Sequence, residues 1–208
     1  TYERIKPVVP PKNVYVITSE SQTAGVRKQL PKVPKDNVVA EPCGRNTCPA
    51  VTLATALVGA RSTTGVMAIL PSDHIIPAKH EKKYQKILEE SFDLCGRGQA
   101  IATIGIKPAK PETGYGYIRV GDTLPPPAGR KAYKTAFYRA ERFVEKPNYH
   151  RALDYLQDGG YRWTAALGMA SWLLGLLLQV LALIYGGTQW VETQSHQSHT
   201  LALAQLLW

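Results

Sequence analysis

The chain has 208 residues, of which 44% are hydrophobic and 20% charged, so it is long enough for one domain with a sizeable core. Its three cysteines, Cys43, Cys48 and Cys95, lack the spacing of a metal site, which favours reduced thiols in a cytoplasmic protein. The start of the chain is polar and does not resemble a secretory signal.

Charge is distributed unevenly along the chain. The first 162 residues contain all 25 Lys and Arg and 15 of the 16 acidic residues, whereas Glu192 is the single charged residue after them. A basic body predicts anionic ligands, and nucleotide and sugar phosphates fit this description. Because no run of five or six Lys and Arg occurs, we expect no nucleic-acid partner.

Strand and helix patterns alternate along the chain after residues 1–11, which are typical of the end of a helix and a proline-punctuated loop. Short apolar runs predict strands at residues 13–18, 38–41, 66–70, 100–106, 115–120 and 136–144. Helical spacing predicts helices at residues 19–30, 48–61, 81–94 and 149–156. The alternation predicts an α/β fold with a Rossmann-like, doubly wound and mostly parallel sheet, here incomplete.

Asp73 follows the predicted strand at residues 66–70, within Leu-Pro-Ser-Asp-His. A carboxylate at the end of such a strand can hold a divalent cation beside phosphate oxygens, because Mg²⁺ often takes only one or two protein carboxylates. The same side chain could instead cap the turn that follows. The residues alone leave these two interpretations about even.

A second polar segment, Glu-Pro-Cys-Gly-Arg-Asn-Thr, precedes the predicted helix at residues 48–61. Thr47 could cap that helix, whose backbone N–H groups would favour an anion, and Arg45 and Asn46 could bind a base or a ribose. The alternative is a capped helix start with a solvated Arg45.

Two further turns follow strand-like runs. Gly114 and Tyr115, with Glu112 nearby, offer bare backbone and an aromatic wall to a ligand, or simply a tight turn. Glu145 can accept hydrogen bonds from two sugar hydroxyls and Lys146 can neutralise a phosphate, although a solvated Glu-Lys pair before a proline is the commoner explanation of such residues.

Taken in this order, the Glu-Pro-Cys-Gly-Arg-Asn-Thr, Leu-Pro-Ser-Asp-His, Glu-Thr-Gly-Tyr-Gly-Tyr and Phe-Val-Glu-Lys-Pro segments resemble the mannose-1-phosphate guanylyltransferases, a family of nucleotide-sugar nucleotidyltransferases. The resemblance covers residues 1–163. It implies transfer of GMP from GTP to mannose 1-phosphate, giving GDP-mannose and pyrophosphate with Mg²⁺ as cofactor, in the cytoplasm. A homo-oligomer is left open.

The resemblance also implies a role for each segment. Asp73 would hold the metal, and the nucleotide would lie against the residues around the second polar segment (Glu41, Gly44, Arg45, Asn46 and Thr47). The sugar phosphate would contact Glu112, Gly114, Tyr115, Glu145 and Lys146, with Lys146 in a catalytic role as a point charge. No covalent nucleophile is implied, because the sugar phosphate itself attacks the α-phosphorus and catalysis depends on positioning and charge neutralisation.

The sequence departs from the family in two places. The family opens with a strand, a Gly-rich phosphate loop and a helix, a unit of about 30–40 residues that has no counterpart here, so we expect this N-terminally truncated chain to bind GTP poorly. The family also continues with Trp-Asn-Ser-Gly, whereas this chain has Thr-Ala-Ala after Trp163.

One restored base before the codon of Thr164 would give a frame that can encode Asn-Ser-Gly. We therefore hypothesise a one-base deletion, which makes 1–163 a partial nucleotidyltransferase domain and 164–208 an out-of-frame tail. The loss of Lys and Arg and the three tryptophans after Trp163 support this. An uninterrupted template without Asn-Ser-Gly in the neighbouring frame would contradict it.

A genuine tail would change the expected function. Residues 165–185 are nearly all apolar and match the roughly 20 residues of a membrane span. One alternative to an enzyme is therefore a membrane-anchored protein, distinguished by partition into detergent. Another is a non-catalytic nucleotide-sugar sensor or regulatory subunit that lost its phosphate loop, distinguished by GDP-mannose binding without pyrophosphate release.

Overall fold

The computed structural model describes residues 1–44, 47–97, 100–125, 132–164 and 200–206, the last range by its backbone. The chain forms two compact units, Thr1–Glu89 and Glu90–Trp208, and each is described by itself. Their boundary differs from the expected division into 1–163 and 164–208, which stays a prediction.

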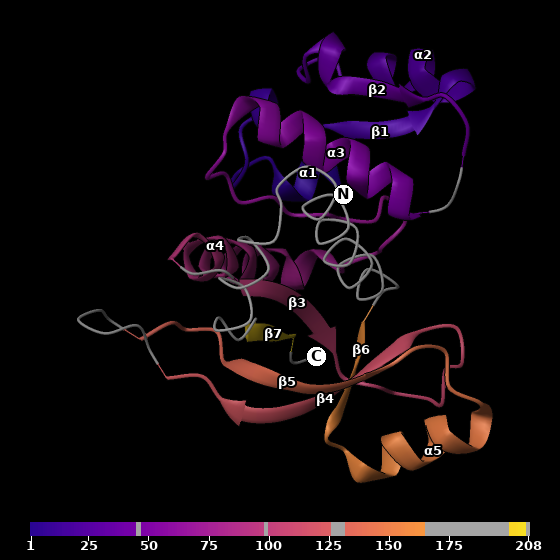
Figure 1. The fold of residues 1–208 in the computed structure, drawn as a ribbon, viewed down its shortest axis with the longest axis vertical. Coiled ribbons are helices and arrows are strands. Elements are labelled where there is room, and N and C mark those ends of the chain that lie inside the picture. The colour runs from indigo at the N-terminus through magenta and orange to yellow at the C-terminus, as the bar shows by residue number, and fades with distance from the viewer. Residues whose placement is uncertain (45–46, 98–99, 126–131, 165–199, 207–208) are drawn as a thin grey trace, which may run out of the picture. The chain divides into compact units, whose positions relative to one another are not determined.

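The first unit is organised around a pair of parallel strands. Its elements are α1 (Tyr2–Ile5), η1 (Pro11–Asn13), β1 (Val16–Ser19), α2 (Glu20–Gln29), η2 (Lys35–Asn37), β2 (Val38–Glu41), α3 (Thr47–Arg61), η3 (Ala78–His80) and the first part of α4 (Glu81–Arg97). Parallel strands require a crossover connection, and α2 supplies it beside β1 and β2 (Figure 1). Buried Val14, Val33 and Val38 form the core of this pair.

Asn37 fixes the entry into β2 through its buried side chain. It is fully buried, and its Nδ2 donates to the backbone oxygens of Lys12, at 3.0 Å, and Val14, at 2.9 Å. Its Oδ1 accepts from Arg61 at 2.9 Å. Since every polar atom of this buried amide has a partner, it ties β2, the start of β1 and the end of α3 together.

The predicted strand at residues 66–70 is wrong. The predicted helices at 19–30, 48–61 and 81–94 and the strands at 13–18 and 38–41 are confirmed to within three residues, but residues 66–70 form no ladder in the structure. Their apolar, β-branched pattern favours extended backbone, yet a strand also needs a neighbour that accepts and donates its backbone hydrogen bonds. None of the described strands supplies those bonds.

The second unit is a sheet that closes on itself. Its strands are β3 (Ala100–Ile106), β4 (Gly116–Thr123), β5 (Phe137–Val144), β6 (Tyr161–Thr164) and β7 (Thr200–Leu206), in the order β3-β6-β4-β5-β7, with β3 also paired to β7. β3 and β7 are parallel and the other pairs are antiparallel. The α/β class is confirmed, and its parallel pairing lies in β1–β2 and β3–β7.

One helix covers part of this sheet. α5 (Tyr149–Asp158) begins where the side chain of Asn148 accepts from the backbone N–H of Arg151, at 3.0 Å, and ends at Gly159, whose φ of 70° suits a glycine. Figure 1 shows α5 alongside β4 and β6. Buried Tyr117, Ala152 and Tyr161 form the core between them.

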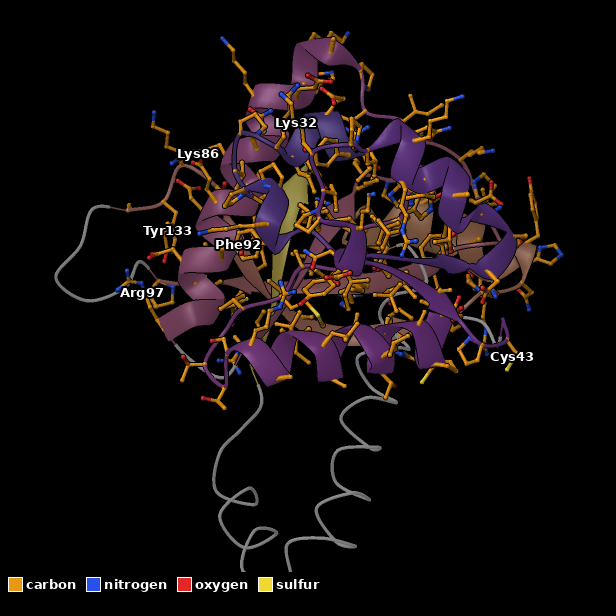
Figure 2. The ribbon with its side chains drawn as sticks, turned by 90° about the horizontal axis from the view of Figure 1, so that it is seen from above. Lys32, Cys43, Lys86, Phe92, Arg97 and Tyr133 are labelled. Atoms are coloured by element: carbon orange, nitrogen blue, oxygen red, sulfur yellow. The ribbon has the colours of Figure 1, made fainter. Side chains whose placement is uncertain are left out.

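The C-terminal half of α4 holds the segment that leads into β5. The Glu90 carboxylate accepts from the backbone N–H groups of Lys134, at 3.0 Å, and Thr135, at 2.8 Å. One turn on, Asp93 accepts from the Tyr133 hydroxyl at 2.7 Å and from Arg97 at 2.9 Å. Figure 2 shows Tyr133 near Arg97, the last residue of the helix.

Within the described part of the chain, no helix is long and apolar enough to cross a membrane. Residues 165–185, for which a span was considered, lie outside it, as does the remainder of the tail up to residue 199.

Candidate functional site

Three strands of the second unit have an end at the same edge of its closed sheet, where β4 begins and β5 and β6 end. β4 begins at Gly116, which lies opposite Thr164 at the end of β6, and Tyr117 lies opposite both Val144 and Trp163. The turn before β4 and the residues after β5 therefore come to the same edge. The structure in this way brings together all five residues predicted to contact a sugar phosphate (Glu112, Gly114, Tyr115, Glu145 and Lys146).

Glu145 has a buried carboxylate without a hydrogen-bond donor. Both of its oxygens are closed to solvent and neither accepts a hydrogen bond from the residues that the structure describes. Its nearest cation is Lys146, whose Nζ lies 3.7 Å from Oε1, beyond hydrogen-bonding distance. An unsatisfied buried charge is costly, so this carboxylate is suited to a ligand that brings its own donors.

Lys146 combines an exposed ammonium with unusual backbone. Its side chain is 60% exposed, so the ammonium can meet a ligand while it lies at ion-pair distance from Glu145. Among the described residues it is the one non-glycine residue with a positive φ, 41°. A side chain in this region costs about 1–2 kcal/mol, and such strain is found most often at functional sites.

The turn before β4 is held by its own polar groups. Glu112 accepts from Lys110 at 2.9 Å and from the backbone N–H of Gly114 at 3.3 Å. The hydrogen bond from Lys110 lowers the pKa of the Glu112 carboxyl and raises the pKa of the Lys110 ammonium. The Tyr117 hydroxyl donates to the backbone oxygen of Glu112 at 2.8 Å. The Glu112 side chain thus shapes the turn, and its contact with a sugar stays a prediction.

Trp163 and Gly116 belong to this edge but are not among the predicted site residues. Tyr115 is 43% exposed and its ring stands edge-on to Trp163, with the centroids 5.5 Å apart. The buried indole N–H of Trp163 has no acceptor among the described residues. Gly116 lies against the Phe143 ring and the Glu145 carboxylate. The signal for Gly116 was present, because two glycines that alternate with tyrosines indicate close approach of backbone. Its neighbours Phe143 and Glu145, however, are distant in sequence.

The predicted nucleotide residues lie in the first unit. Glu41 ends β2, and Gly44 has open space where a Cβ would stand. α3 begins at Thr47, while Arg45 and Asn46 lie outside the described residues. The nearby Cys43 is exposed (Figure 2). The segment therefore leads from the carboxyl end of a parallel strand into a helix, where α/β folds bind ligands.

The loop that contains Asp73 is fastened to α1. The Thr1 hydroxyl donates to the backbone oxygen of Pro71 at 2.9 Å, and the Arg4 guanidinium donates to that of His74 at 3.0 Å. Arg4 also lies over the Tyr84 ring, 5.6 Å from its centroid. These contacts hold both sides of the loop and leave the Asp73 side chain exposed.

Asp73 belongs to no cluster of three potential metal ligands among the described residues. Across the residues that the structure describes, no three His, Cys, Asp or Glu side chains gather to hold a metal. A single exposed carboxylate on a fastened loop fits Mg²⁺, which keeps water or phosphate oxygens in its other positions, and does not fit a closed structural zinc site.

The chain is similar to known proteins over most of its length. Residues 5–171 match the nucleotidyl transferase family. Mannose-1-phosphate guanylyltransferase 2 of Escherichia coli O157:H7 is 36% identical over 158 residues, which are 74% of this chain and 32% of that protein. The mannose-1-phosphate guanylyltransferase of Salmonella montevideo is 38% identical over 154 residues, 73% of this chain and 31% of that protein.

A solved structure shares the fold. The crystal structure described as a mannose-1-phosphate geranyltransferase from Thermus thermophilus superimposes with a TM-score of 0.71 and 26% identity, covering 98% of this chain and 62% of that one. The chain spans about a third of the length of the curated relatives it matches. The expected resemblance is confirmed, and relatives of this kind do not favour the sensor or membrane-anchored alternatives. The chain belongs to the nucleotidyl transferase family.

Proposed function

We propose that this chain is part of an enzyme that transfers GMP from GTP to mannose 1-phosphate, forming GDP-mannose and pyrophosphate. The observation that carries the proposal is the Glu145 carboxylate, buried and without a donor among the described residues, at the edge where three strands end. Neutral sugar hydroxyls are donors that would satisfy both of its oxygens. Its position after β5 matches the role expected from the family resemblance.

The remaining groups at this edge suit the other parts of a sugar phosphate. The exposed Lys146 ammonium would meet the phosphate as a point charge. The half-exposed Tyr115 ring, supported from behind by Trp163, would form a wall beside the sugar. A sugar site needs this combination of charged acceptors and flat apolar surface.

The nucleotide would bind at residues 41–47, and Mg²⁺ would bind at Asp73. A bound Mg²⁺ would supply charge neutralisation at the phosphates of the nucleotide. The chain's own residues position the reactants: Glu145 orients the sugar, and Lys146 places the phosphate oxygen that attacks the α-phosphorus of GTP as pyrophosphate leaves. Positioning of this kind can supply about 7–11 kcal/mol of a reaction barrier.

The state of the cysteines supports a proposal for the compartment. The three cysteines of the chain are free in the structure, with Cys43 exposed. Free thiols are typical of reducing compartments, so we place the enzyme in the cytoplasm.

Binding rather than turnover is the direct test, because the proposal is carried by a carboxylate that would bind the sugar. Isothermal titration with GDP-mannose and with mannose 1-phosphate would be compared for the wild type, Glu145→Gln and Glu141→Gln. Glu141 is a matched control because it is an exposed glutamate on β5, the strand that ends just before Glu145. UDP-glucose titrated in parallel tests the choice of base and sugar.

We expect Glu145→Gln to lose about tenfold or more in affinity, the size of a lost charged hydrogen bond, and Glu141→Gln to stay within about twofold. Equal affinities for the wild type and Glu145→Gln would contradict the proposal. Tighter binding of UDP-glucose than of GDP-mannose would replace the substrate while retaining the site.

A further inference from the structure

Gly116 occupies the place where a side chain would collide with the candidate site. A Cβ at this position would lie 2.6 Å and 2.8 Å from Cε2 and Cζ of the Phe143 ring and 3.1 Å from Oε2 of Glu145. Carbon atoms in proteins do not approach to 2.6 Å without displacement, since their optimal separation is about 3.5–4.0 Å. The ring and the carboxylate thus both rest on bare backbone.

The backbone of Gly116 cannot move away to relieve such a collision. β4 is an inner strand, paired with β5 on one side and β6 on the other, and Gly116 itself lies opposite Thr164. Glu145, by contrast, follows the last paired residue of β5, Val144, so no ladder holds it in place. Any side chain at position 116 would therefore displace Phe143 and Glu145 rather than β4.

We propose that Gly116 is the positioning residue of Glu145. Because Gly116 has no side chain, the carboxylate can occupy a place that no donor of the described residues reaches. The hydroxyl groups of a ligand then supply the hydrogen bonds that the carboxylate lacks. This inference rests on the proposed function for the ligand it names. The arrangement of Gly116, Phe143 and Glu145 is independent of that ligand.

Gly121 provides a matched control on the same strand. A Cβ there would approach Cγ and Oε1 of Glu141 to 2.7 Å. The Glu141 side chain is 49% exposed and pairs with the exposed Arg119, so its displacement into solvent costs no more than a surface ion pair. Gly116→Ala and Gly121→Ala are therefore the same chemical change in the same strand, one against a ring and a buried carboxylate and one against an exposed side chain.

The test measures GDP-mannose affinity in Gly116→Ala, Gly121→Ala, Glu145→Ala and the Gly116→Ala/Glu145→Ala double variant. We expect a loss of about tenfold or more for Gly116→Ala and less than about twofold for Gly121→Ala. Because Gly116 acts through Glu145, adding Gly116→Ala to Glu145→Ala should cost less than about twofold more. Wild-type affinity in Gly116→Ala, or losses that add fully, would overturn the inference.

A readout without ligand separates this inference from the proposed function. The carboxyl-carbon NMR resonance of Glu145, assigned by its disappearance in Glu145→Gln, should shift in Gly116→Ala and stay in place in Gly121→Ala. If the wild type binds no GDP-mannose, the proposed function fails, and this resonance still decides whether Gly116 positions Glu145. An unshifted resonance in Gly116→Ala would overturn the inference.

If Gly116→Ala does not fold, the double variant Gly116→Ala/Phe143→Leu takes its place, compared with Phe143→Leu alone. Leucine lacks the two ring atoms of the collision, whereas the 3.1 Å approach to Oε2 remains. We expect the double variant to fold and still to show the shifted resonance and the loss of affinity. Identical resonances and affinities in this pair would overturn the inference.

Discussion

Glu90 and Glu145 are glutamates of the same unit with buried carboxylates, but only the carboxylate of Glu90 is hydrogen-bonded by backbone donors of the described residues. Two N–H groups, from Lys134 and Thr135, bind the Glu90 oxygens at 3.0 Å and 2.8 Å. Both Glu145 oxygens are buried without such a donor. This difference indicates that the Glu90 carboxylate stabilises the fold and that the Glu145 carboxylate binds a ligand. An unsatisfied buried charge lowers the stability of a protein, so it is retained where binding requires it.

The largest expected effect is the loss of stability on replacing Glu90, and its absence would contradict this comparison. Glu90→Ala should lower the free energy of unfolding by about 2–4 kcal/mol, because it leaves two partly buried backbone N–H groups without acceptors. Urea denaturation measures this value. The adjacent exposed Glu89→Ala is the control and should change stability by less than about 0.5 kcal/mol. A Glu90→Ala variant as stable as Glu89→Ala would show that the two hydrogen bonds to Lys134 and Thr135 are dispensable.

The backbone of Lys146 offers a smaller effect of the opposite sign. Glycine adopts a φ of 41° without strain, so Lys146→Gly should be about 1 kcal/mol more stable than Lys146→Ala in urea denaturation. Both variants lack the ammonium and should lose affinity for mannose 1-phosphate equally. Equal stability of the two variants would mean that the site stores no strain at this residue.

Tyr133→Phe tests a second hydrogen bond between α4 and the segment that Glu90 holds. It removes the hydrogen bond to Asp93 and should cost about 1 kcal/mol. Burial raises the pKa of Tyr133, and the hydrogen bond to Asp93 raises it further. The contribution of the tyrosine is thus fully present below its unfolded value of 10.0 and is lost as pH rises through the folded pKa.

The urea midpoint of the wild type should therefore fall more steeply than that of Tyr133→Phe above pH 10.0. Parallel pH profiles of the two proteins would show that the hydrogen bond of Tyr133 to Asp93 does not help to hold the segment before β5.

The smallest effect is expected at Glu112, which shapes the turn beside Glu145. Lys110 lowers the pKa of Glu112, so the contribution of this pair is present above the unfolded value of 4.5 and is lost as pH falls through the folded pKa. Glu112→Gln should flatten the acid limb of the stability profile slightly, because the pair is exposed. A loss of sugar affinity as large as that of Glu145→Gln would show that Glu112 contacts the sugar as well as shaping the turn.

Much of the fold could be predicted from local sequence patterns. The apolar, β-branched runs at 38–41 and 100–106 predict strands with the bounds that β2 and β3 have. Residues 66–70 carry a similar pattern and form no strand, because pairing depends on a neighbour and not on the run itself. Short β6 was missed, since four residues that include an arginine and a threonine give no clear period.

The candidate site was predictable in its residues and not in its energetics. Turn chemistry and the family resemblance identify Glu145 and Lys146. No local pattern predicts that the Glu145 carboxylate lacks donors while Glu90 finds its donors 44 and 45 residues away in the chain. The approach of Phe143 to Gly116 likewise depends on the register of β4 with β5.

The central claim is that Glu145 is held for a ligand at the expense of stability, and one variant tests both halves. For Glu145→Gln, the free energy of unfolding and the affinity for GDP-mannose would be measured on the same preparation. We predict unchanged or slightly higher stability together with an affinity loss of about tenfold or more. A variant that is clearly less stable and binds GDP-mannose as the wild type does would contradict the account and make Glu145 a structural residue like Glu90.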